Sequence, residues 1–461
     1  MVSCLLCLGL LRYFWAQEPQ PQALGFDYHS SGSSDSNWTA GPSASLGGTG
    51  CPTSDGLDDV LIVLRTSATE IYEKLPIHLA TTFARISNYL VYSDVEQDLG
   101  ELEVHDALSH ILKDLREQHS DLAQYRTLQQ HISTGGNAAE LGEENSRRLD
   151  KWKFLPMIRD AYHRFGAQKK WFVFMEADTH VSRHNLRLWL KHLNSSTAVY
   201  AGAQDVIGET ELARGGSGFM MSAMAAKAFT ETYESRRTNW EHRTADECCG
   251  DKLVAEVLLK ATPPIHVSQA FPILQGETLA SLDWSSGHWC RPAVSWHHVD
   301  AAGINRLWQF ERQWRHRKGF NRPILFRDYF AAFIEPRILL ANGSMPDWDN
   351  LSNDWVFQQG LINHPSYASA ATCADFCYLR GECLQWAWSP GSCRAGKTVR
   401  LGWALRNRPA LGSAEDRFAQ AGSLGTEGAV SGWMLDRIEA FKQLQEPCRP
   451  SRMWDVHEDY M

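Results

Sequence analysis

The strongest constraint on the fold comes from apolar segments that alternate with helical patterns in the first half of the chain. Asp59 to Leu64 is a continuous apolar run, and residues 87–94 (SNYLVYSD) form a second run that ends in polar residues. Between them, four apolar residues recur at the spacing of one helix face: Ile71, Leu75, Leu79 and Phe83. Strands that are apolar throughout and joined by helices indicate a parallel sheet covered on both faces. We therefore expect an α/β fold.

The same pattern recurs around the stretch WFVFMEADTH, residues 171–180. The segment before it, Asp150–Phe165 (DKWKFLPMIRDAYHRF), is amphipathic and predicts a helix. The apolar run then ends in two carboxylates, Glu176 and Asp178, whose side chains point the same way if the strand continues. Two like charges this close repel each other unless a cation lies between them. Because ligands bind at the carboxyl ends of strands in open α/β sheets, we favour a divalent cation site over a plain surface strand end.

The segments around this region are assigned by the same rules. Residues 103–131 predict exposed helix, interrupted by STGGNAAELGEEN. Asn185 to Leu193 predicts another helix, and STAVYAGAQDVIG (residues 196–208) a further strand. The first half of the chain thus alternates strands and helices, and we expect the carboxylate pair on a central strand of the sheet.

The overall composition bounds the class of protein. The chain has 461 residues, which is enough for one large domain plus accessory parts. Its formal net charge of -9 gives no electrostatic case for binding nucleic acid, so we exclude that class of partner. Eighteen tryptophans is a high count, and carbohydrate-handling sites favour such large rings with a polar edge.

Cysteines and glycosylation sequons point to an oxidising secretory compartment. Four of the eleven cysteines cluster near the C-terminus, and four N-x-S/T sequons are present, at Asn37, Asn194, Asn342 and Asn350. The clustered cysteines are Cys373, Cys377, Cys383 and Cys393. A zinc site is the competing interpretation of that cluster, but its spacings lack the paired C-x-x-C pattern of structural zinc sites.

The N-terminal region predicts targeting rather than folded structure. Residues 1–16 form an apolar run shorter than the ~20 residues of a membrane helix, and we expect a signal peptide or a signal anchor. Residues 17–50 are rich in Gly, Ser and Pro and predict a flexible stem. Either form of targeting directs the chain to the secretory route, and a membrane anchor at the N-terminus stays open.

Two motifs downstream of the carboxylate pair invite a functional interpretation. In ARGGSGFMM, Gly215, Gly216 and Gly218 allow a tight backbone approach before a helix predicted to start near Met221. The G-x-S-x-G pattern of a hydrolase nucleophile is absent because Phe219 occupies the last glycine position.

In TADECCGDKL, Asp246 and Glu247 precede a predicted helix whose Leu253, Val257 and Leu258 face inward. Acidic residues at a helix start are often only caps or partners of the helix dipole, and this alternative stays open. Further on, His297 and His298 close a predicted strand from Ala293 to Trp296. A neutral imidazole can join two carboxylates in binding Mn²⁺.

These segments, in this order, resemble glycosyltransferase family 31, the inverting β1,3-glycosyltransferases that include Fringe and the core 1 galactosyltransferase, with the fungal branch most similar. The resemblance extends from about Asp59 to about Asp300. It rests on RTSAT, DKWKFLPMI, WFVFMEAD, GGSGF, the acidic residues before CCGD, and WCRPAVSWHHV. It implies a GT-A fold that binds a UDP-sugar donor with Mn²⁺ and transfers the sugar to a glycan or glycoprotein acceptor.

The resemblance also implies roles for single residues. The family's D-x-D motif corresponds to Glu176-Ala177-Asp178, with Glu in place of the first Asp. The resemblance assigns direct metal contact to Asp178, and contact with the ribose or with a metal-bound water to Glu176. Glu176 is therefore counted among both the predicted metal residues and the predicted nucleotide-binding residues. The family's metal-binding histidine in S-F-H-x-V matches His297, and His298 is not carried over.

The catalytic base of the family is the Asp of an E-D-x-x-x-G pattern. With Gly250 as the anchor, the base corresponds to Asp246, although Ala245 departs from the family's preceding acid and Glu247 remains a rival. Arg65 and Thr66 match the strand end that meets the uracil and ribose, and the glycines at 215, 216 and 218 match the loop beside the donor sugar.

In the mechanism implied by the resemblance, the metal neutralises the charge that develops on the leaving UDP. A carboxylate on the opposite face of the sugar takes the proton of the acceptor hydroxyl. The expected product is a β1,3-linked hexose, with galactose on O-linked GalNAc, as in the core 1 enzyme, as the first substrate hypothesis.

The C-terminal part differs in pattern from the rest. We expect a catalytic domain at residues 51–335 and a C-terminal lobe at 336–461. Within that lobe, residues 365–400 resemble a PAN/apple-type cysteine module, with a helix carrying Cys373 and Cys377 and a strand near Gln385–Trp388. The resemblance favours the pairs Cys377–Cys383 and Cys373–Cys393, among three pairings that four cysteines allow. The module either binds a glycan or protein partner or, as we favour, stabilises the catalytic domain.

Further bridges are predicted from the remaining cysteines. The catalytic region holds Cys51, Cys248, Cys249 and Cys290, which leaves room for two more disulfides. We also expect the chain to return through a helix from Asp436 to Leu444 and pack before Cys448.

Two other functions compete with the transferase. The first is an inactive GT-A-type protein that binds glycans as a lectin, favoured by the replacement at Glu176 and the displaced acid before CCGD. The second is a glycosidase, which is weaker because Glu176 and Asp178 lie too close on one strand to flank a glycosidic bond. For the leading hypothesis we expect the Golgi lumen, as a single-pass type II membrane protein or a secreted form.

Overall fold

A computed structural model describes residues 56–84, 86–166, 168–360, 364–407 and 428–454. The predicted signal segment, the predicted stem, Cys51 and the sequon at Asn37 lie outside these ranges. Among the helices within the described ranges, none combines the length and the apolarity needed to cross a bilayer.

The largest sheet has eight strands, most of them in parallel pairs, in the order β11-β7-β10-β5-β1-β2-β4-β3. β1 pairs in parallel with both β2 and β5, β2 with β4 and β7 with β11, whereas β10 runs antiparallel to β5 and β7. The strands are β1 Val60–Arg65, β2 Tyr89–Ser93, β3 Gln97–Leu99, β4 Leu102–Asp106, β5 Trp171–Glu176, β7 Tyr200–Gly202, β10 Phe219–Ser222 and β11 Val267–Gln269. The predicted α/β fold with a mainly parallel sheet is confirmed.

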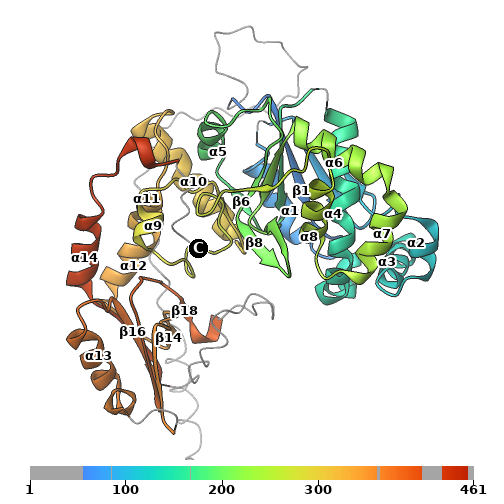
Figure 1. The fold of residues 1–461 in the computed structure, drawn as a ribbon. Helices are drawn as coiled ribbons and strands as arrows, with labels where there is room; N and C mark the ends of the chain where they lie inside the picture. Colours follow the sequence, from blue (N-terminus) through green and yellow to red (C-terminus); the bar gives the residue numbers. More distant parts are fainter. Residues whose placement is uncertain (1–55, 85, 167, 361–363, 408–427, 455–461) are drawn as a thin grey trace, which may run out of the picture. The chain divides into compact units, whose positions relative to one another are not determined.

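Helices cover both faces of this sheet, as the uniformly apolar strands predicted (Figure 1). On β1, Leu61 and Val63 join one core with residues of four helices, and the alternate residues Ile62 and Leu64 join another with residues of two further helices. The first four helices are α4 Glu143–Phe165, α6 Ala223–Ser235, α7 Arg237–Asp246 and α8 Gly250–Leu259; the other two are α1 Ile71–Ala80 and α5 Arg183–Leu190. Burial on both faces explains why these strands show no polar alternation.

Two local expectations are wrong. Residues 103–131 are not one interrupted helix: β4 and its neighbour β3 come first, followed by α2 (Lys113–Gln118), α3 (Ala123–Ser133) and the 3₁₀ turn η1 (Ala138–Leu141). The helix expected near Met221 begins at Ala223, because Phe219–Ser222 is a buried strand between β5 and β7. The predicted strand at 196–208 is confirmed as β7 followed by β8 (Gln204–Ile207), which forms a hairpin with β9 (Thr210–Ala213).

The chain between the sheet and the C-terminal lobe is mostly helical. A two-stranded pair joins β6 (His180–Val181), directly after the carboxylate motif, to β12 (Ser295–Trp296), directly before the histidine pair. This pairing brings the two motifs together. The helices of this part are α9 Ser286–Trp289, α10 Ala301–Lys318, α11 Phe326–Tyr329, the π-helix η2 Phe330–Ile334 and α12 Glu335–Leu340; α7 Arg237–Asp246 comes earlier, between α6 and α8.

The C-terminal lobe contains a five-stranded antiparallel sheet in the order β13-β19-β16-β17-β15. Its strands are β13 Ser344–Pro346, β15 Trp355–Gln358, β16 Gln385–Ser389, β17 Ser392–Gly396 and β19 Val430–Trp433; β14 (Trp348–Asp349) pairs with β18 (Trp403–Ala404). The helices are α13 Ala370–Leu379 and α14 Leu435–Leu444, with 3₁₀ turns η3 Pro365–Ala368, η4 Leu405–Asn407 and η6 Pro450–Arg452. One apolar core contains residues on both sides of position 335, from Leu282 to Ile438.

The disulfides confirm the two bonds predicted for the C-terminal cluster. Two further bonds are present among the described residues, and one of them uses Cys448, which was not counted among the cysteines left for such bonds. Cys373–Cys393 and Cys377–Cys383 are bonded as expected, which excludes the zinc interpretation of that cluster. The remaining bonds within the described residues are Cys290–Cys448, which ties the end of the lobe to the part of the chain before residue 335, and Cys248–Cys249, between adjacent residues.

Candidate functional site

A cavity of about 910 Å³ lies where strands β1 and β5 end. Arg65 and Thr66 from the end of β1, and Glu176 and Asp178 from the end of β5, line it. The chain reverses direction after parallel strands at this edge, so polar side chains converge here without interrupting the apolar core. The cavity has the size of ordinary small-molecule sites.

Asp178, His297 and His298 form a group of potential metal ligands in this cavity. One ligand atom from each lies within 4.8 Å of the others. Asp178 Oδ1 is 3.5 Å from His297 Nε2, and Asp178 Oδ2 is 3.7 Å from His298 Nδ1. The two imidazole rings stack with centroids 3.7 Å apart, and His298 takes a positive φ of 54°. Such a backbone conformation is uncommon outside glycine and is enriched where a side chain is held for function.

Two atoms of this group are buried without a hydrogen-bond partner. Asp178 Oδ1 and His297 Nε2 both have this property. The two atoms form a loose ion pair at 3.5 Å, too long for a good hydrogen bond, and at this separation both could bind one cation. The carboxylate and imidazole donors fit a divalent metal such as Mn²⁺ or Zn²⁺.

Electrostatics in the group follow from the same geometry. Burial alone would raise the pKa of Asp178, but His297, His298 and Lys74 hold it well below its usual value. Burial alone would lower the pKa of His297, but Asp178 and Glu176 raise it to about 10. The protein on its own therefore places a proton on His297, and a cation binding there must displace that proton.

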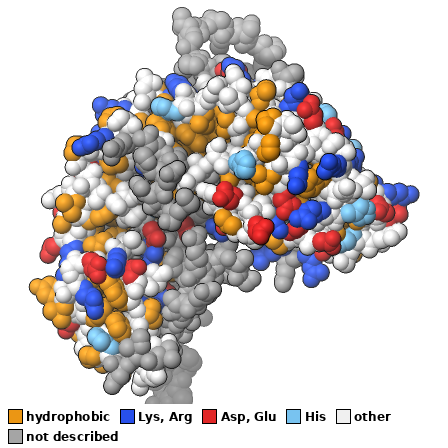
Figure 2. Space-filling view, in the orientation of Figure 1, with side chains coloured by type: hydrophobic (Ala, Val, Ile, Leu, Met, Phe, Trp, Pro, Cys, Tyr) orange, Lys and Arg blue, Asp and Glu red, His pale blue; other side chains and the backbone are white. Residues whose placement is uncertain are grey.

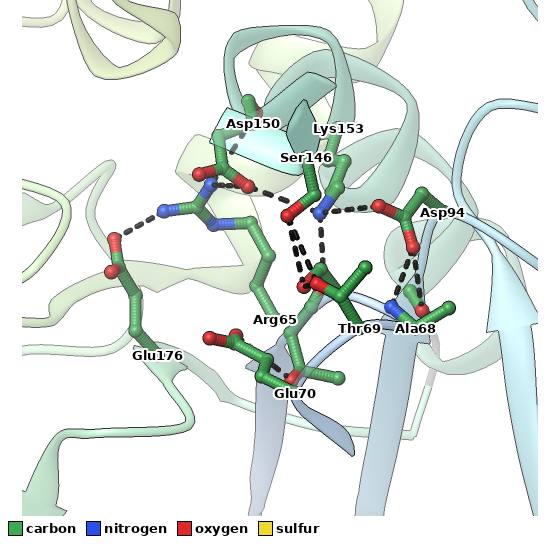
Figure 3. Close-up of polar contacts among 12 residues, drawn as sticks. Arg65, Ala68, Thr69, Glu70, Asp94, Ser146, Asp150, Lys153 and Glu176 are labelled. Carbon is green, nitrogen blue, oxygen red and sulfur yellow. Dashed lines mark hydrogen bonds and ion pairs between the residues drawn. The ribbon is translucent and has the colours of Figure 1, made fainter. Parts of the chain in front are cut away.

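Glu176 makes its main contact with Arg65 rather than with the metal group. Arg65 forms an ion pair with Glu176 and lies 3.4 Å from Asp150 Oδ1 (Figure 3). Its guanidinium also stacks over the Phe154 ring, 4.2 Å from the ring centroid. Burial alone would raise the pKa of Glu176, but Arg65 and then His297 lower it to about 2. Glu176 Oε2 is 3.7 Å from His297 Nε2, so the carboxylate borders the metal group without belonging to it. Glu176 therefore stays ionised.

A fully buried lysine fixes the turn that follows β1. Lys153 of α4 donates to the Thr66 carbonyl at 2.8 Å and to Asp150 at 3.0 Å, and lies 3.5 Å from Asp94 (Figure 3). Asp94 in turn accepts from the Ala68 amide at 2.7 Å. This network explains why α4 carries the charged residues Asp150 and Lys153 at positions that face the turn after β1. The amphipathic pattern of the helix does not explain them.

The segment after Thr66 adds another carboxylate and a lysine to the cavity wall. Glu70 accepts from Thr66 Oγ1 at 3.1 Å and pairs with Lys74 at 2.6 Å, and Lys74 lies 4.0 Å from Asp178. Burial raises the pKa of Glu70, and Lys74 offsets only part of that rise. Lys74 thus places a positive charge beside the metal group.

The glycine loop approaches the metal group closely. A Cβ at Gly216 would lie 2.1 Å from the His297 ring, so only glycine fits beside that histidine. Gly218 has a φ of 77°, a conformation that favours glycine. Gly215 donates its amide to Asp251 Oδ2 at 3.0 Å. Gly216 lines the cavity, and the other two glycines shape the loop around it.

The two predicted catalytic acids are not among the residues that line the cavity. Asp246 is the last residue of α7 and is exposed. Glu247 pairs with Lys252 at 2.7 Å and Arg243 at 2.8 Å, which lower its pKa. The acid that does line the cavity here is Asp251, whose pKa is raised by burial. A base function for Asp246 or Glu247 therefore remains a prediction.

Sequence reasoning missed five residues of the site: Glu70, Lys74, Asp150, Lys153 and Asp251. His298 was considered together with His297, but the family resemblance did not carry it over as a metal ligand. The five missed residues are single charged residues in helical patterns. No protein-family model matches the chain, and no curated protein matches it either.

Proposed function

We propose that this protein is a metal-dependent inverting glycosyltransferase that moves a hexose from a UDP-sugar to a glycan acceptor in a β1,3 linkage, on a fold of the GT-A type. One observation supports this most strongly. Asp178 Oδ1 and His297 Nε2 are buried, lack a hydrogen-bond partner and lie 3.5 Å apart in a cavity at the carboxyl edge of a mainly parallel sheet. A divalent cation between them would bind both atoms.

Asp178, His297 and His298 would hold that cation, with Mn²⁺ as the proposed metal. When bound, it supplies positive charge for the diphosphate leaving group of the donor. The chain itself adds positive charge: Lys74 lies beside Asp178, and Arg214 and Lys151 also line the cavity. Because the cavity lining holds more carboxylates than Lys and Arg side chains, binding of an anionic nucleotide-sugar would also depend on the charge of the bound cation.

The end of β1 has the groups that a nucleoside requires. Arg65 is held rigidly by Asp150, Glu176 and the Phe154 ring, and its guanidinium presents donors in a fixed plane. Glu176 is ionised and can accept hydrogen bonds from the hydroxyls of a ribose. We assign uracil and ribose recognition to Arg65, Thr66 and Glu176 on this basis.

Inverting transfer needs a base for the acceptor hydroxyl. The base takes the proton as the hydroxyl oxygen bonds to the anomeric carbon and the bond to the UDP oxygen breaks. A carboxylate with a raised pKa that contacts the cavity suits this step. Asp251 meets both conditions, and Asp246 and Glu247 remain the candidates from the family resemblance.

An inactive glycan-binding protein is the second candidate. The observation that favours it is the position of Asp246 and Glu247 away from the cavity-lining residues. In that case the cavity would bind sugar, and Asp251 would not act as a base. For either function we propose the lumen of the secretory pathway, where the four disulfides are stable.

The test is UDP release by the purified chain with UDP-galactose, UDP-glucose, UDP-GlcNAc or UDP-GalNAc, in Mn²⁺ or in EDTA. We expect turnover with one donor in Mn²⁺, none in EDTA, and a loss of at least about 100-fold in Asp178→Asn. Glu73→Gln is the matched control, because this carboxylate lines the same cavity but lies outside the metal group. Glycan binding without turnover for any donor would favour the inactive alternative.

A further inference from the structure

The disulfide between Cys248 and Cys249 lies in the wall of the cavity. Both residues line it, Cys248 is exposed and Cys249 is half-buried. The other three bonds join residues 158, 20 and 6 positions apart, whereas this one joins neighbours. In the chain-entropy view, a disulfide stabilises a fold by closing a loop, and this one encloses no residue between its ends. Stabilisation of the fold by loop closure therefore does not explain the Cys248–Cys249 disulfide.

The segment that carries the disulfide is held in place from both sides. Lys151 of α4 donates to the carbonyls of Ala245 and Glu247 at 3.1 and 2.9 Å and pairs with Asp121 at 3.0 Å. On the other side, Gly250 packs so closely on Phe154 that a Cβ there would lie 2.2 Å from the ring. The two sulfur atoms therefore form a preorganised surface.

This surface is apolar, and the rest of the cavity wall holds many charged side chains beside a smaller number of apolar ones, among them Phe154 and Ile304. Arg65, Asp150, Lys151 and Asp251 also line the cavity. A disulfide has no hydrogen-bond donor and only weak acceptors, so it cannot add to ion or hydroxyl recognition. What it can offer is van der Waals contact with an apolar face of a ligand.

We propose that the Cys248–Cys249 disulfide is a contact surface for the C–H face of a pyranose ring in the cavity. Pyranoses carry C–H groups on one face and hydroxyls around the rim, so an apolar patch beside carboxylates and amines matches both parts of the ring. The neighbouring Asp251 is placed to accept from a rim hydroxyl. This inference deepens the proposed function and rests on it for the class of ligand. The ring belongs either to the donor or to the acceptor.

The experiment compares the purified wild-type chain with the Cys248→Ser/Cys249→Ser variant. Saturation-transfer NMR and titration measure binding of methyl galactoside, methyl glucoside and methyl N-acetylgalactosaminide as acceptor probes. UDP-galactose and UDP-GlcNAc with Mn²⁺ are the donor probes, and UDP with Mn²⁺ is the nucleotide reference. We expect the variant to bind one of the two sugar sets roughly tenfold more weakly, with UDP binding unchanged. The set that weakens identifies the ring.

Two further variants separate surface chemistry from folding. Cys248→Ala/Cys249→Ala keeps the surface apolar without the bond, and we expect it to recover part of the sugar binding. Cys377→Ser/Cys383→Ser removes a disulfide from the C-terminal lobe and should leave sugar binding unchanged. Thermal unfolding of each variant checks that the chain is folded.

Two results with the wild-type chain would overturn the proposal: free thiols at Cys248 and Cys249, or no sugar binding by a chain that binds UDP. Two results with the serine variant would also overturn it. These are binding of every sugar probe as tightly as by the wild type, or a loss of UDP binding as large as the loss of sugar binding. Wild-type binding of methyl glycosides without any UDP binding would instead reject the transferase and leave the sugar surface supported if the serine variant weakens it.

Discussion

His78 donates a hydrogen bond from Nε2 to the backbone oxygen of Ala177 at 2.7 Å. Ala177 is the residue between Glu176 and Asp178, so this contact fixes the turn that carries both carboxylates. Burial lowers the pKa of His78 to about 4, so the imidazole is neutral. Its Nδ1 therefore accepts from Thr82 Oγ1 at 2.9 Å. The ring acts as a spacer between α1 and the metal group.

Replacing this ring tests its positioning role. His78→Leu leaves the Ala177 carbonyl unpaired, and we expect Mn²⁺-dependent UDP binding to weaken by about 10- to 100-fold. The free energy of unfolding should fall by about 1–3 kcal/mol. His78→Gln can still donate to the carbonyl and should recover most of both losses. Calorimetric titration and thermal unfolding measure the two effects. If the Leu variant binds the metal as tightly as the wild type, the turn at Ala177 does not depend on His78.

If the chain is the proposed transferase, three amide variants decide which acid serves as its base. Asp251→Asn keeps the acceptor for the Gly215 amide, and we expect it to slow transfer by about 100- to 10,000-fold with UDP-sugar binding retained. Asp246→Asn and Glu247→Gln should slow it less than about tenfold, because neither side chain lines the cavity. Single-turnover rates and donor binding are the measurements. The reverse ranking would restore the assignment made from the family resemblance.

A buried histidine makes stability depend on pH. His288 has a pKa lowered by burial from 6.5 to about 4, and its ring nitrogens bond Ser285 and Gln275. Between pH 6.5 and 4 the unfolded chain binds a proton that the folded chain does not. The free energy of unfolding therefore falls as pH falls through that window, by up to about 3 kcal/mol from this group. Below pH 4 this contribution levels off.

The sign can be checked with His288→Gln, which cannot titrate. Denaturant unfolding at pH 7 and pH 4.5 should show a smaller pH dependence in the variant than in the wild type. An unchanged difference between the two pH values would mean that His288 is not the source.

The sequons make a prediction about glycosylation in a secretory host. Asn194 and Asn342 are exposed, whereas Asn350 is buried. The Asn350 amide donates to the carbonyls of Trp386 and Gly432 at 3.0 and 3.2 Å, so a glycan there is incompatible with this fold. We expect peptide mass spectrometry to find glycans on Asn194 and Asn342 and none on Asn350.

A stability comparison accompanies that measurement. Asn350→Gln should lower the free energy of unfolding by about 1–3 kcal/mol because it misplaces two buried hydrogen bonds. Asn194→Gln is the control, because Asn194 is exposed and has no positive φ, and it should change the free energy of unfolding little. A glycan found on Asn350 in folded protein would contradict the structure of the C-terminal lobe.

Local sequence determined the parts of this protein that depend on neighbours along the chain. The strands β1, β2 and β5 were predictable because a strand buried on both faces is apolar at every position. The helix α4 was predictable from its period, and the bonds of Cys373 and Cys377 matched the pairing expected from the module they resemble. The short strand Phe219–Ser222 was not, because four apolar residues before an alanine-rich helix fit either state.

Only the tertiary structure decided which side chains meet. Asp178 and His298 lie far apart in the sequence and come together because β6 pairs with β12. Asp251 enters the cavity wall, and Asp246 does not, because the helix start at Gly250 packs against Phe154. Periodicity reports which face of an element is buried, but it carries no information on which segments cross. The metal group and the disulfide surface both depend on such crossings.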